Sequence, residues 1–237
     1  MANPLSVVLV SGGLDSCVTA AIAAKEGDVA LLHVNYGQRT EEKELKCFNR
    51  IAKHFRAKQT LIVDFQHLKT IGASSLTDKK IEVPKGDISR KDIPSTYVPF
   101  RNANLLSAAV SWAEAIGARS VYIGAVEEDS SGYPDCREGF FRAFEEAVGK
   151  GTRPDTAIKI KTPLIRLTKK EIVKKGVELN APFDLTWSCY KDSIEACGEC
   201  DSCLLRMKGF KEAGIKDPLP YRNKKGSPLF QRGDRGD

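Results

Sequence analysis

One turn in this chain combines the residue types that bind phosphate. Residues 11–16, SGGLDS, follow an apolar run and precede an Ala-rich segment that we expect to be a helix. Glycines let backbone N–H groups approach a ligand closely, and a helix N-terminus adds a partial positive charge. Ser11 and Ser16 add hydroxyl donors. We therefore predict a phosphate site here, with a purely structural turn as the alternative.

Asp15 is the unusual residue in such an anion-binding turn. Its carboxylate has a function there if it meets Mg²⁺ that is shared with the bound phosphates. Capping of the following helix is the structural alternative for the same side chain.

A second group of residues has the spacing of a metal site. Four cysteines follow the pattern C-x7-C-x2-C-x2-C, at positions Cys189, Cys197, Cys200 and Cys203. Four thiolates at this spacing fit tetrahedral zinc. An iron–sulfur cluster is the alternative, but the bacterial ferredoxin run would place a cysteine at position 207, where this chain has Met207. We predict a structural zinc, since four protein ligands leave no open position for catalysis.

The elements that must position these groups alternate regularly. Apolar runs over residues 6–10, 29–34, 60–65, 120–125 and 158–162 are typical of buried strands, and segments 15–26, 40–55, 102–116 and 135–148 of helices. A capping box, Thr168 to Glu171, begins a further helix. This order predicts an α/β fold with a doubly wound, five-stranded parallel sheet and a ligand site at the carboxyl ends of its strands. We read residues 66–99 as an extended loop over that site.

The same pass along the chain predicts its organisation. Residues 1–181 form the α/β domain, 182–215 a helical zinc-binding segment, and 216–237 a polar tail that we expect to be frayed. No apolar run reaches the length of a membrane span and no signal-peptide pattern begins the chain, so we expect a cytoplasmic protein. The net charge of +6 allows an anionic ligand but does not by itself argue for nucleic acid.

Several further residues lie where the sheet predicts a ligand edge. Tyr36 and Arg39 follow the second strand and are candidates for nucleotide contacts, whereas His33 is expected to be a core histidine. We expect Cys17 and Cys47 to be small buried residues. Cys136 is expected to be an inert thiol near the site, with a covalent role as the alternative.

The phosphate turn matches neither of two common nucleotide motifs. The chain contains no G-x-x-x-x-G-K-[ST] and no G-x-G-x-x-G. SGGLDS instead resembles the pyrophosphate loop of the N-type ATP pyrophosphatases. The resemblance implies that ATP is cleaved between its α- and β-phosphates, with Mg²⁺ present. It also implies that the nucleotide is held by Val10, Ser11, Gly12, Gly13, Leu14, Asp15 and Ser16.

Four stretches together are more specific: SGGLDS, VPFRN at 98–102, SSGYPDCR at 130–137, and TWSC with CGECDSC between 186 and 203. With these, the chain closely resembles the 7-cyano-7-deazaguanine synthase family of the queuosine precursor pathway, which has an adenine nucleotide alpha-hydrolase-like fold. The resemblance implies a homodimer that converts 7-carboxy-7-deazaguanine, ammonia and ATP to the 7-nitrile. It implies catalytic roles for Asp15, Arg101 and Arg137, and substrate contacts from Tyr133, Asp135 and Arg137.

One position departs from the family pattern, V-P-G-R-N, because Phe100 replaces the glycine. We expect its bulk to reshape the backbone just before Arg101. Two other functions stay open. A tRNA-modifying thiolase or amide-forming ligase with the same loop would need an RNA-binding extension or a larger basic face, and no direct nucleic-acid contact is expected. The second alternative function is that of a non-catalytic module, which either binds a nucleotide or mediates a zinc-dependent interaction.

Overall fold

The structure, a computed structural model, describes residues 3–87, 92–127 and 132–222. Within these residues, five parallel strands form one sheet in the order β3-β2-β1-β4-β5. The strands are β1 (Leu5–Leu9), β2 (Asp28–Asn35), β3 (Gln59–Asp64), β4 (Ser120–Tyr122) and β5 (Lys159–Lys161). The doubly wound parallel sheet predicted from the sequence is therefore confirmed.

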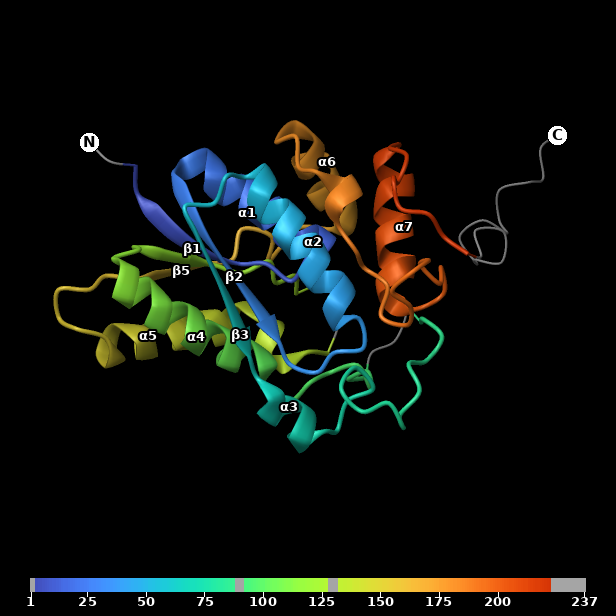
Figure 1. Cartoon of the computed structure of the whole chain (residues 1–237), viewed down its shortest axis with the longest axis horizontal. Helices are drawn as coiled ribbons and strands as arrows, with labels where there is room; N and C mark the ends of the chain where they lie inside the picture. Colours follow the sequence, from blue (N-terminus) through green and yellow to red (C-terminus); the bar gives the residue numbers. More distant parts are fainter. Residues whose placement is uncertain (1–2, 88–91, 128–131, 223–237) are drawn as a thin grey trace.

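Helices cover both faces of the sheet (Figure 1). One layer contains α1 (Leu14–Glu26), α2 (Glu41–His54), α6 (Lys169–Glu178) and α7 (Asp201–Ala213). The other layer contains α4 (Arg101–Ile116) and α5 (Glu138–Gly151). Alternation along β1 serves both layers, because Val8 faces the first and Val7 and Leu9 face the second. Burial of both faces explains why the central strands β1 and β2 are nearly continuous apolar runs, whereas the edge strands β3 and β5 are partly exposed and carry polar residues.

The strand order places a switch point beside β1. The chain winds from β1 outward to β2 and β3, then returns to β4 on the other side of β1. Loops that leave neighbouring strands in opposite directions open a crevice at their carboxyl ends. The turn at residues 11–16 lies at this point, between β1 and α1.

Of the segment 66–99 that we expected to be an extended loop, the described residues 66–87 and 92–99 have more structure than expected. They begin with helix α3 (Gln66–Ile71), and the buried Ser74, Ser75 and Leu76 follow. Leu68 and Leu76 pack with Tyr36 and Val98. This small apolar cluster gives the segment its structure, which a polar composition did not suggest.

The structure changes two further expectations. The expected helix over residues 135–148 is divided: a 3-10 turn at Pro134–Cys136 is followed by α5, because Arg137 between them is extended. The tail is also packed as far as Arg222, where Tyr221 is buried and bridges to Ala196. The rest of the expected tail, residues 223–237, lies outside the described residues.

Other local predictions are confirmed. Thr168 and Glu171 form the capping box of α6 by reciprocal hydrogen bonds. His33 is buried with Nδ1 2.9 Å from the Val10 carbonyl oxygen, as expected of a core histidine. Cys17 and Cys47 are buried. Among the helices that the structure describes, none is long and apolar enough to cross a membrane.

Candidate active site and metal centre

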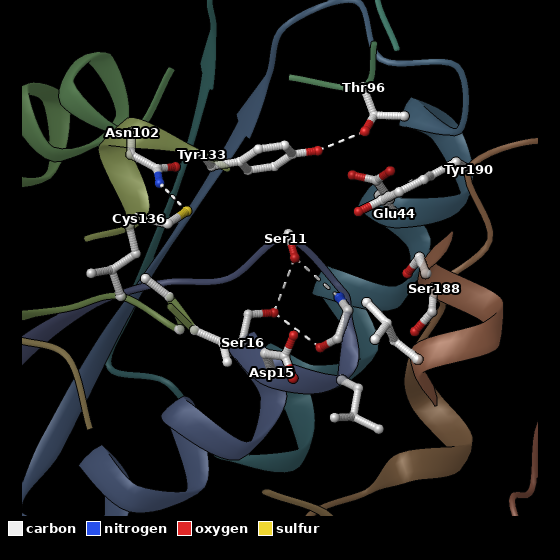
Figure 2. A pocket seen from close by; sticks show the side chains of 18 of the residues that line it. Ser11, Asp15, Ser16, Glu44, Thr96, Asn102, Tyr133, Cys136, Ser188 and Tyr190 are labelled. Carbon is white, nitrogen blue, oxygen red and sulfur yellow. Dashed lines mark hydrogen bonds between the residues drawn. The ribbon is translucent and has the colours of Figure 1, made fainter. Parts of the chain in front are cut away.

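A pocket of about 440 Å³ opens at the carboxyl ends of the strands. The phosphate turn forms one part of its wall (Figure 2). An apolar part is lined by residues at the strand ends and on α4, namely Leu9, Leu32, Val34, Leu105, Ile123 and Ala125. A polar and aromatic part is lined by Tyr36, Glu44, Thr96, Arg101, Tyr133 and Tyr190. The pocket can thus hold a ligand with phosphate, apolar and hydrogen-bonding portions.

The geometry of the turn depends on Gly12. Its φ is +90°, and a Cβ there would lie 2.6 Å from the backbone oxygen of Glu44. Only glycine fits so close to α2 in this conformation. Gly12 itself does not line the pocket, and its carbonyl oxygen accepts a hydrogen bond from the Trp187 N–H at 2.9 Å. Gly12 therefore positions the turn, while its neighbours face the pocket.

The hydroxyl groups of Ser11 and Ser16 form hydrogen bonds within the turn. Ser11 Oγ accepts from the Gly13 N–H at 3.2 Å and lies 3.2 Å from Ser16 Oγ. Ser16 Oγ donates to the Gly13 carbonyl oxygen at 3.0 Å (Figure 2). Of the residues predicted to bind the nucleotide here, the pocket is lined by Val10, Ser11, Gly13, Leu14, Asp15 and Ser16. These groups stand at the N-terminus of α1, where the helix favours an anion.

Positive charge gathers around the turn. Lys169, the first residue of α6, donates to both carboxylate oxygens of Asp15 at 2.8 and 2.9 Å. Arg206 and Lys208, on α7, also line the pocket. Sequence reasoning missed these cations. Helices α6 and α7 lie more than half of the chain away from the turn, so no local pattern connects them to it. Lys169 is paired with Asp15 and Arg206 with Asp217, so carboxylates balance much of this positive charge before a polyphosphate binds.

Arg101 lies in the polar part of the pocket. Its Nη1 donates to Tyr36 Oη at 3.4 Å, and its guanidinium carbon lies 5.7 Å from the centre of that ring. In the described part of the chain, Arg101 forms no ion pair with a carboxylate, so an anionic ligand group can take that place. Burial raises the pKa of Tyr36 to about 12, which keeps this neighbour neutral.

Three residues expected in the site do not line this pocket. Arg39 donates to the backbone oxygens of Ser75, Asp78 and Ile81, which fixes the segment after α3. The Asp135 carboxylate accepts from the Asn102 backbone N–H at 2.8 Å and so holds the start of α4. Arg137 is exposed beyond the 3-10 turn. The side chains of Arg39 and Asp135 therefore satisfy backbone groups of folded segments and do not face the pocket.

The neighbours of Asp135 do reach the pocket. Tyr133 lines it and lies 2.7 Å from Thr96 Oγ1 through its hydroxyl oxygen. Cys136 also lines it, and its Sγ accepts from Asn102 Nδ2 at 3.2 Å (Figure 2).

Sequence reasoning missed Glu44, Trp187 and Tyr190 as well. Trp187 lies within the motif TWSC and Tyr190 follows it directly, but the motif indicated a function for its cysteine alone. Glu44 lies on the amphipathic helix α2, where an acidic residue looks like part of the solvent-facing surface.

The four clustered cysteines come together as a buried group. The Sγ atoms of Cys189, Cys197, Cys200 and Cys203 lie within 4.8 Å of one another. Backbone N–H groups of Lys191 and Cys197 donate to Cys189 Sγ at 3.3 and 3.4 Å. Hydrogen bonds from the thiols of Cys189, Cys200 and Cys203 lower the pKa of Cys197. A set of four converging soft sulfur ligands with N–H donors around it can hold a metal ion.

The fold and the turn at residues 11–16 together define a nucleotide-binding α/β protein with a pyrophosphate-type loop. The chain belongs to the QueC family, since the family model described as "Queuosine biosynthesis protein QueC" matches residues 5–214. This confirms the family resemblance that the four motifs indicated.

Two relatives are named 7-cyano-7-deazaguanine synthase. That of Chloroherpeton thalassium is 57% identical over 92% of this chain and 96% of its own length. That of Chlorobaculum tepidum is 56% identical over 91% of this chain and 96% of its own length. A solved structure described as a predicted subunit of tRNA methyltransferase from Methanocaldococcus jannaschii has a similar fold, with a TM-score of 0.50, 17% identity and 94% coverage of both chains.

Proposed function

We propose that this chain is an ATP-dependent carbon–nitrogen ligase that converts 7-carboxy-7-deazaguanine and ammonia to 7-cyano-7-deazaguanine, the activity in the names of its relatives. The observation that carries the proposal is a single pocket that joins the phosphate turn to an aromatic, arginine-bearing part. An acid acceptor and ATP can meet there.

The first step is activation of the acid. A carboxylate is a poor electrophile, and transfer of AMP from ATP to one of its oxygens makes the carbonyl carbon reactive. Pyrophosphate leaves into the turn at residues 11–16, which internal hydrogen bonds among Ser11, Gly13 and Ser16 hold in a fixed shape at the N-terminus of α1. Lys169 adds a cation beside Asp15. Arg101 binds the anionic groups that react, either phosphate or carboxylate oxygens.

Magnesium would enter with ATP. Asp15 offers carboxylate oxygens at the mouth of the turn, which is the ligand type that Mg²⁺ prefers together with phosphates. When bound, the ion supplies charge neutralisation for the departing pyrophosphate.

The same pocket runs two rounds. Ammonia displaces AMP from the acyl adenylate and leaves the primary amide. A second ATP then transfers AMP to the amide oxygen with release of pyrophosphate. Loss of AMP and the remaining amide protons yields the nitrile. Two ATP thus give two AMP and two pyrophosphate per nitrile.

The cysteine cluster is proposed to bind one structural zinc, because four buried thiols satisfy a tetrahedral ion and leave no position for substrate. We also propose a cytoplasmic homodimer, following the family resemblance. Exposed apolar side chains such as Ile93 and Phe100 offer surface for a second copy.

Purified protein with ATP, Mg²⁺, ammonia and the acid tests the proposal. Mass spectrometry should detect the nitrile, with two AMP for each. The 7-carboxamide should be converted with ATP alone, without ammonia. Untouched carboxamide, or one AMP per nitrile, contradicts the two-round route. A requirement for added tRNA would favour the thiolase or amide-ligase alternative instead.

A further inference from the structure

Glu44 stands in the pocket wall with its carboxylate held in place. Thr40 Oγ1 donates to Glu44 Oε1 at 2.7 Å, and Gln38 Nε2 donates to Oε2 at 3.1 Å. Gln38 is itself fixed, because its Oε1 accepts from the Tyr36 N–H at 2.8 Å. A carboxylate has about four acceptor positions, so two such bonds orient it and leave capacity for a ligand.

The surroundings of Glu44 are those of a site for a flat, polar ring. Tyr36, Tyr133 and Tyr190 line the same part of the pocket and offer aromatic surfaces. Figure 2 shows the Glu44 and Tyr190 side chains directed into the pocket, across from the turn that carries Asp15 and Ser16. Burial raises the pKa of Glu44 because it removes water from the charged form, and the hydrogen bonds from Thr40 and Gln38 offset part of this effect.

Glu44 differs from the other acids of the pocket. Four acids line it among the described residues: Asp15, Glu44, Asp87 and Asp201. Asp15 is paired with Lys169, and Asp201 Oδ1 accepts from the Asp87 N–H at the start of α7. Glu44 lines the polar part of the pocket together with Tyr36 and Arg101, and its own donors are Thr40 and Gln38.

We propose that Glu44 reads the base edge of the acceptor by accepting hydrogen bonds from its ring N1–H and 2-amino group. This inference rests on the proposed function. The 2-aminopyrimidinone edge of a guanine-type ring presents two adjacent donors, which match the two oxygens of one carboxylate. Adenine presents an amino group beside an acceptor nitrogen, which a carboxylate repels. Glu44 would therefore keep ATP and acceptor in their own parts of the pocket.

The test compares wild type, Glu44→Gln and the matched control Glu42→Gln, an exposed acid on the same helix. Each is given 7-carboxy-7-deazaguanine and the analogue without the 2-amino group. Binding of both acids is measured by calorimetry without ATP, and KM and kcat with ATP. We expect wild type and E42Q to prefer the 2-amino compound by on the order of 10²-fold or more, and E44Q by under about tenfold. The KM for ATP should stay within about threefold.

Loss of packing around Glu44 would weaken both acids equally, so a changed preference is the informative readout. An unchanged preference in E44Q overturns the inference, as does a change confined to the KM for ATP, which would indicate ribose or adenine contact. Wild type that binds the acid but makes no nitrile contradicts the proposed function alone, and wild type that binds neither acid contradicts both. If E44Q melts far below wild type, E44D replaces it, with the same loss of preference expected.

Discussion

Asp15, in the first turn of α1, and Lys169, the first residue of α6, form an ion pair across 154 positions of sequence. Nζ of Lys169 lies 2.8 and 2.9 Å from the two carboxylate oxygens. The lysine side chain is only 10% exposed, whereas that of Asp15 is 33% exposed and lines the pocket. The pair therefore fixes α6 to the phosphate turn and keeps both charges at the place where pyrophosphate is expected.

The first prediction concerns this acid. Asp15→Asn should lower kcat by about 10²-fold or more, because a preorganised charge at the reacting phosphates is removed. The fold should persist, with an unfolding free energy lowered by about 1–2 kcal/mol, since the amide still accepts from Lys169. Steady-state rates and a urea titration measure both. Asp28→Asn, which removes a partly exposed 3.7 Å pair with Lys58, is the control and should change neither by a comparable amount. Near-normal rates at saturating Mg²⁺ and ATP would contradict the role of Asp15.

The second prediction concerns the cysteine cluster. The purified chain should contain one zinc and no visible absorbance. Cys200→Ser should lose the metal and several kcal/mol of stability, because binding of a structural metal is coupled to folding. Metal analysis and thermal melting test this. Cys17→Ala is the control, since Cys17 is buried outside the cluster, and should keep the metal. Iron in place of zinc would refute the assignment.

The third prediction concerns the anchor of the C-terminal segment. Arg206 is 1% exposed and pairs with Asp217 at 3.0 Å. Asp217→Ala leaves this buried guanidinium without its carboxylate and should cost about 3–5 kcal/mol. Denaturant unfolding measures the loss. Glu212→Ala breaks an exposed contact with Lys208 and should change stability by less than about 0.5 kcal/mol. Equal effects of the two variants would mean that the buried pair is not an anchor.

The fourth prediction concerns Phe100, which precedes α4 at φ +54° and ψ +28°. This is a left-handed conformation, which glycine adopts readily and a residue with a side chain adopts at a cost. Phe100→Gly should therefore be about 1 kcal/mol more stable than Phe100→Ala. Both variants lose the contact with Phe140, so it cancels in the comparison. At the exposed helical position Ser111 the same pair should rank oppositely, because glycine there disfavours the helix. Melting curves of the four variants decide the sign.

The sequence by itself determined the parts of this protein that depend on neighbouring residues. Alternation of apolar runs with amphipathic segments predicts the sheet, because the period of burial follows from local backbone geometry. The turn at residues 11–16 and the capping box at Thr168 are likewise short-range patterns. The four cysteines converge because their spacing already confines them.

Only the tertiary structure decided which side chains share the pocket. Lys169 and Glu44 come from helices that the sequence marks as ordinary amphipathic elements, and packing of α6 and α2 around the turn brings them to it. Arg39 and Asp135 are of the right type but bond to backbone groups of folded segments instead. Which side chains line the pocket depends on contacts between residues far apart in the chain and on the hydrogen bonds that every buried polar group requires. A local sequence pattern predicts neither.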